Sequence, residues 1–255
     1  MFIRLLTSGL AGLLIVIIFE ILYAWPAALY VGFFSLVVIL FFALWLIMGK
    51  KLKTPGSRFY LLIPPLFLAV STYGFSLFVN PGIILHGLAL SVAGGIVLYL
   101  CQVTQYLWRH ENYLPFSLES ISSGFHLFTI FFLSASFFAV NIFLNFSLFL
   151  LTLLTGGLVF ILLWHTIWIN KFLLKETKYF AIVNSLLLME LFLALSSLPY
   201  SFTSKGAWFA IAWYTLSEGT RGYLLKTPLK AYLKGRIIFS IFLALLLVVS
   251  SKWKI

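Results

Sequence analysis

Residues 146–169 read FSLFLLTLLTGGLVFILLWHTIWI, a stretch without a single charged side chain. At a rise of about 1.5 Å per residue in an α-helix, it is long enough to cross a hydrocarbon core about 30 Å thick. It is apolar on every side, whereas a strand of a membrane barrel would alternate apolar and polar residues. The stretch therefore predicts a transmembrane helix.

The same pattern recurs along the whole chain. Hydrophobic residues make up 63% of the 255 residues and charged residues only 9%, against about a quarter charged in soluble domains. Trp25-Pro26 and Leu114-Pro115 separate apolar blocks, because proline removes a backbone donor and disfavours helix in the residue before it. We predict an all-α polytopic integral membrane bundle that forms a single domain over residues 1–255. About nine transmembrane helices are expected, near 3–24, 27–48, 59–79, 82–107, 118–141, 146–169, 179–199, 206–225 and 236–251.

The first block also fits a cleaved signal peptide, with Arg4 as its positively charged N-terminal region. Its length, and the absence of an A-x-A cleavage pattern after it, favour a retained span. The last block is short, so an even number of spans stays open.

The distribution of Lys and Arg sets the orientation. If the N-terminus is cytoplasmic, the outer side holds Lys205, Lys252 and Lys254, and the inner side holds the other 14 of the 17. Basic residues concentrate in cytoplasmic loops, so we predict a multi-pass protein of the cell membrane with its N-terminus and basic loops inside. The net charge of +11 does not indicate a nucleic-acid partner, because the basic residues lie in short clusters between apolar blocks.

The scarcity of reactive groups excludes many functions. All six acidic residues are glutamates, and Cys101 is the only cysteine. The sequence has no phosphate-binding G-x-x-x-x-G-K-[ST] loop, and Leu114 stands where a zinc-protease motif beginning at His110 needs its second histidine. We therefore expect no catalytic residue, no metal site, no cofactor and no intrachain disulfide.

Two sets of charged residues inside spans are the main functional candidates. Glu190 lies near the middle of the span at 179–199, where an ionised carboxylate costs about 3 kcal/mol. It fits a proton or cation carrier in a gated path, or a carboxyl group hydrogen-bonded to a neighbouring helix. Glu218 and Arg221, three residues apart, share a helix face and can pair. Arg221 would then either reach toward the interface or hold an anionic headgroup or substrate carboxylate.

Other polar residues fall in the predicted cytoplasmic halves of spans and would extend such a path: Gln102, Gln105, Glu119, His126 and His165. Glu119 and His126, seven residues apart, can share one face of a helix. Each histidine also fits a hydrogen-bonded packing residue.

Lysines at four-residue spacing predict a basic stripe on a helix near the C-terminus, formed by Lys226, Lys230 and Lys234 and followed by Arg236. The stripe fits anionic lipid headgroups, and the general excess of positive charge on the inner side is the alternative explanation. Gly32, Gly94 and Gly156 are each 62 residues apart, which indicates either a repeated helical hairpin or close packing between helices.

These observations favour a small transporter or permease-like protein that uses Glu190, Glu218 and Arg221 in a polar path. The first alternative is a non-catalytic membrane assembly subunit or lipid-binding scaffold. The second is a membrane-embedded enzyme acting on lipids, with Glu119, His126 or Glu190 as acid or base. Expected partners are the lipid bilayer with its anionic headgroups, and either another membrane protein or a second copy of the chain.

Overall fold

The computed structural model of the chain describes residues 2–49, 55–80, 82–109, 111, 113–172, 177–224, 238, 240 and 241. Its long elements within those ranges are all α-helices, joined by short connections. In chain order they are α1 (Phe2–Ala24), the 3-10 helix η1 (Pro26–Ala28), α2 (Leu29–Met48), α3 (Pro55–Ser76), α4 (Ile83–Trp108), α5 (Ser117–Leu144), α6 (Leu148–Ile169), α7 (Thr177–Ser196) and α8 (Phe202–Leu224).

Seven of the helices in the described residues, α1 to α7, are long and apolar enough to cross a membrane. The prediction of an all-α multi-span bundle is therefore confirmed, and the predicted number of nine spans is approximate. Helix α8 is long enough but falls outside the seven, and it carries Lys205, Glu218 and Arg221. The ninth expected span, 236–251, lies almost entirely outside the described residues.

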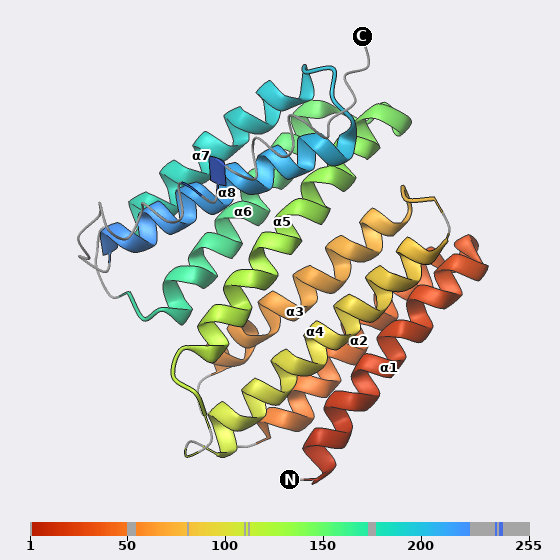
Figure 1. The fold of residues 1–255 in the computed structure, drawn as a ribbon, viewed down its shortest axis with the longest axis vertical. Coiled ribbons are helices and arrows are strands. Elements are labelled where there is room, and N and C mark those ends of the chain that lie inside the picture. The colour runs from red at the N-terminus through yellow and green to blue at the C-terminus, as the bar shows by residue number, and fades with distance from the viewer. Residues whose placement is uncertain are drawn as a thin grey trace. The chain divides into compact units, whose positions relative to one another are not determined.

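The chain divides into two compact units, residues 1–126 and 127–255. In unit 1, α1 packs against both α2 and α4, and α3 packs against α2 and α4; Figure 1 shows α1 and α4 running side by side. Side chains tie these helices together by donating hydrogen bonds to backbone carbonyls. The Tyr99 hydroxyl of α4 donates to the carbonyl of Leu61 in α3 at 2.9 Å. Trp108 Nε1, also from α4, donates to the carbonyl of Ile47 in α2 at 3.0 Å.

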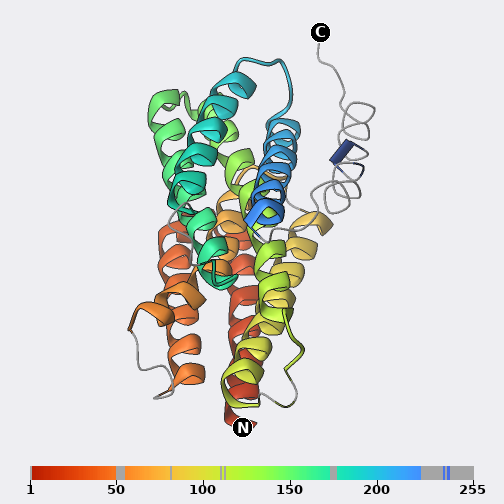
Figure 2. The ribbon, with the colours of Figure 1, turned by 90° about the vertical axis from the view of Figure 1, so that its left-hand side faces the viewer.

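Unit 2 contains the rest of α5 together with α6, α7 and α8. Helix α7 packs against α6 and α8, and these helices run alongside one another in Figure 2. The rings of Phe138 in α5 and Phe192 in α7 stack with their centroids 4.3 Å apart. At Gly206, a Cβ atom would lie 2.7 Å from the Ala135 Cβ atom. The backbones of α5 and α8 therefore approach closely where both residues are small.

Close packing accounts for two of the three regularly spaced glycines. A Cβ atom at Gly32 would overlap the hydroxyl of Tyr73, and one at Gly156 would overlap the Met189 side chain. At Gly94, by contrast, a Cβ atom would meet nothing within 4 Å. Close packing between helices is therefore sufficient to explain Gly32 and Gly156, without a repeated structural unit.

Candidate functional site

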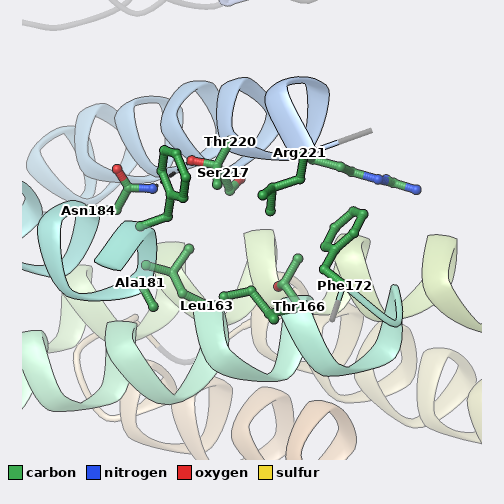
Figure 3. A pocket seen from close by; sticks show the side chains of 11 residues that line it. Leu163, Thr166, Phe172, Ala181, Asn184, Ser217, Thr220 and Arg221 are labelled. Carbon is green, nitrogen blue, oxygen red and sulfur yellow. Dashed lines mark hydrogen bonds between the residues drawn. The ribbon is translucent and has the colours of Figure 1, made fainter. Parts of the chain in front are cut away.

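Polar side chains of α7 and α8 meet at a small pocket inside unit 2. The pocket has a cavity volume of about 20 Å³, which is room for about one water molecule. Asn184 Nδ2 of α7 donates a hydrogen bond to the Thr220 hydroxyl of α8 at 2.7 Å. Figure 3 shows these two residues on one side of the pocket, with Leu163 and Thr166 of α6 beneath them. The pocket is a local polar contact between helices and is too small to hold an organic substrate.

Glu218 and Arg221 come together as their spacing predicts. Arg221 Nη1 lies 3.7 Å from Glu218 Oε1, and only 8% of the Glu218 side chain is exposed, against 22% for Arg221. Arg221 borders the pocket, and in Figure 3 its guanidinium group extends past Phe172, away from Asn184. The adjacent guanidinium lowers the free-energy cost of burying the Glu218 carboxylate inside the helix bundle.

Glu190 is not part of this pocket. The buried face of α7 carries Asn184, Leu188 and Phe192, and Glu190 lies about 120° around the helix from Asn184. Its side chain is exposed. Among the described residues, no hydrogen bond or ion pair involves the Glu190 carboxylate. Glu190 therefore does not join Glu218 and Arg221 in one polar path through unit 2.

Gln102 and Glu119 belong to a hydrogen-bonded cluster where α4 ends and α5 begins. The Ser117 hydroxyl donates to Gln102 Oε1 at 3.0 Å, and the Tyr113 hydroxyl donates to Glu119 Oε2 at 3.2 Å. Burial, reinforced by the Glu119 carboxylate, raises the pKa of Tyr113. The Tyr113 hydroxyl both donates to Glu119 and accepts from the backbone N–H of Leu118, so the cluster holds the connection between α4 and α5 in place. Gln105, on α4, lies outside these contacts and is half-buried.

The two candidate histidines are both buried but lie in different units. His126 is 1% exposed on α5, at the end of unit 1, and His165 is fully buried on α6 in unit 2. The His165 ring packs near Trp168, with ring centroids 5.9 Å apart. Within the described residues, no group of three or more His, Cys, Asp or Glu side chains could hold a metal ion. The stripe of Lys226, Lys230, Lys234 and Arg236 lies outside the described residues.

Sequence reasoning missed an ion pair in unit 1. It joins Glu20 of α1 to His86 of α4, whose Nδ1 atom lies 2.6 Å from Glu20 Oε1. Both side chains are about two-fifths exposed, and Tyr23 packs its ring edge-on to His86 at 5.2 Å. The residues are 66 positions apart, so no spacing rule within one helix could have joined them.

Lys205, which the distribution of Lys and Arg predicts to lie on the outer side, is buried within unit 2. It is only 5% exposed. Its Nζ atom donates a hydrogen bond to the carbonyl of Ser196, the last residue of α7, at 2.8 Å. A cation at a helix C-terminus stabilises the carbonyls that have no partner in the helix. Lys205 therefore joins the start of α8 to the end of α7.

The chain matches no protein-family model, and no curated protein or solved structure matches it. The fold by itself defines the class: a membrane-embedded, multi-pass helical protein.

Proposed function

We propose that the protein is a membrane assembly subunit that associates with a second copy of itself through the exposed face of α7. The observation that carries this proposal is the position of Glu190, which lies inside an apolar helix and faces outward. Acidic residues in spans almost always face a bundle interior, a water-filled cavity or a partner. A partner helix that covers Glu190 would remove the carboxyl group from contact with lipid.

The residues around Glu190 support a helix contact. Val183, Leu187, Glu190, Ala194 and Ser197 are all exposed and follow one another at spacings of four, three, four and three. We call these five residues, the last of which lies one residue beyond the end of α7, the α7 seam. This alternation of threes and fours is the repeat with which one helix packs along another. Ala194, one turn beyond Glu190, lets a second backbone approach closely.

A carboxyl group is also suited to pairing with its own copy. In its neutral form it donates one hydrogen bond and still accepts others, so two such groups can bond to each other across a two-fold axis. Polar side chains that bond between membrane helices stabilise association by about 0.6–2 kcal/mol. The α7 seam offers such a group at its centre, with apolar side chains of Val183 and Leu187 on one side of it.

Dilution of the purified protein in lipid vesicles tests the proposal. Energy transfer between donor- and acceptor-labelled copies would be measured as the protein-to-lipid ratio falls. We expect Glu190→Leu to weaken association by about threefold to thirtyfold, whereas Glu190→Gln, which keeps a donor and an acceptor, retains it. Ala194→Phe should also weaken association, because it adds bulk to the seam with the carboxyl group intact.

Leu154→Ala is the matched control, because Leu154 is exposed on α6 and is not part of the α7 seam. It should leave association unchanged. Unchanged energy transfer in Glu190→Leu, or a wild-type protein that is monomeric at every dilution, would contradict the proposal.

A small transporter is the second candidate function, and the pocket beside Asn184 and Thr220 is the observation that favours it. If this pocket belongs to a water-filled path, Asn184→Cys in a Cys101→Ser background should react with a water-soluble maleimide in intact vesicles. If α7 and α8 pack without such a path, the cysteine should react only after denaturation. Among the described residues of unit 2, most hydroxyl groups donate to carbonyls of their own helix, as Thr155 and Ser185 do, and this favours the second outcome.

A further inference from the structure

A second cavity lies in unit 1, where α1 begins and α4 ends. Its volume is about 250 Å³, more than ten times that of the pocket in unit 2. Arg4 and Leu5 line it from α1, and the rest of its lining comes from the last turns of α4 and the residue that follows: Cys101, Thr104, Gln105, Trp108 and Arg109. It shares no residue with the α7 seam, so it is independent of the proposed association.

The Arg4 side chain is held in place beside this cavity. Its guanidinium carbon lies 3.4 Å from the centroid of the Trp108 ring, a stacked arrangement in which the ring face attracts the cation. The ring is fixed in turn, because Trp108 Nε1 donates to the carbonyl of Ile47 in α2. Stacking on one face leaves the guanidinium donors, which point outward in the plane of the group, available to a ligand.

The cavity has positive charge without a matching negative charge. Within the described part of the chain, no carboxylate lies within ion-pair distance of Arg4 or Arg109. Unit 1 has three acidic residues in the described part of the chain, and none of them lines the cavity. Glu20 contacts His86, Glu119 accepts a hydrogen bond from Tyr113, and the exposed Glu111, two residues after Arg109, forms no ion pair with the described residues. Two guanidinium groups on one cavity therefore attract an anion from outside the protein.

The position of the cavity indicates which anion. It lies at the ends of two apolar helices, on the side that the Lys and Arg distribution predicts to be cytoplasmic, where anionic lipids accumulate. Arginine binds phosphate through two parallel hydrogen bonds, and the Gln105 side chain adds an amide donor. Leu5 gives one wall an apolar surface. We propose that this cavity binds the phosphate group of an anionic membrane lipid.

Binding of phosphatidylglycerol to the full-length protein in neutral detergent micelles tests the proposal, with bound lipid counted by native mass spectrometry. The double variant Arg4→Gln/Arg109→Gln should lower lipid affinity by about thirtyfold. Arg109→Gln alone, at an exposed position, should lower lipid affinity by about fivefold. This single variant still tests the site if the double variant misfolds. The charge-matched control, Lys171→Gln/Lys178→Gln, changes two exposed lysines and should bind like the wild type.

A parallel titration with inorganic phosphate separates the two sources of the phosphate group. We expect millimolar phosphate neither to compete with phosphatidylglycerol nor to raise the unfolding temperature. Stabilisation by phosphate alone that is lost in Arg4→Gln/Arg109→Gln would overturn the assignment to lipid in favour of a soluble phosphate ligand. Wild-type lipid binding by both arginine variants, or an equal loss in the lysine control, would overturn the site itself.

Discussion

The two units of the chain place their charged side chains differently. In unit 1 the charges whose contacts are described lie near helix ends: Arg4 near the start of α1, Glu20 near its end, and Arg109 just after α4. In unit 2, Glu190 lies inside α7 and Glu218 lies two turns before the end of α8. Charge at the end of a span can interact with headgroups and water, whereas charge within a span needs a protein partner. The difference separates a surface suited to lipid headgroups from one suited to another helix.

The largest effect is expected at the close approach of α5 and α8, which builds unit 2. Gly206→Leu should lower the free energy of unfolding by about 3 kcal/mol or more, because a Cβ atom there would already lie 2.7 Å from the Ala135 Cβ atom and 3.0 Å from its backbone. Gly157→Leu is the matched control, since a Cβ atom at Gly157 meets nothing within 4 Å. Denaturation titrations in mixed micelles measure both variants, and equal stability of the two would show that the approach of α5 and α8 is not required.

A smaller loss is expected when the buried charge at the start of α8 is removed. Lys205→Met keeps most of the apolar chain but deletes the hydrogen bond to the Ser196 carbonyl, so we expect a loss of about 2 kcal/mol in the same titration. Lys178→Met, at an exposed position on α7, should change stability by less than about 0.5 kcal/mol. If both lysine variants unfold alike, Lys205 does not join α7 to α8.

The smallest effect is expected at the ion pair near the end of α1 in unit 1. Glu20→Gln keeps the shape of the side chain but removes its charge, and both partners are about two-fifths exposed. Because solvent screens such pairs, the loss should be under about 1 kcal/mol. A double-mutant cycle with His86→Gln isolates the interaction between the two side chains. A coupling energy well above this value would mean that unit 1, like unit 2, depends on charge for its packing.

The helices could be predicted closely from the sequence because their lengths follow from apolar runs and proline breaks. The predicted span at 82–107 corresponds to α4 at Ile83–Trp108, and that at 146–169 corresponds to α6 at Leu148–Ile169. The pairing of Glu218 with Arg221 was also predictable, because residues three apart on one helix always share a face.

Contacts between helices could not be predicted in the same way. Helix α7 is apolar around most of its circumference, so its sequence does not indicate which side packs inward, and the outward position of Glu190 depends on α6 and α8. The cavity between Arg4 and Arg109 likewise depends on α1 lying beside α4. Asn184 and Thr220, each polar but uncharged, gave no signal in the sequence that would have joined them.

Cysteine crosslinking along α7 tests the central proposal most directly. Single cysteines would be introduced at each position from 182 to 197 in a Cys101→Ser background, and oxidative crosslinking between copies would be measured in native membranes. The proposed α7 seam predicts that crosslinked dimer peaks at 183, 187, 190, 194 and 197 and falls at the buried positions 184, 188 and 192. A flat profile, or no crosslinked dimer at any position, would contradict association through the face that carries Glu190.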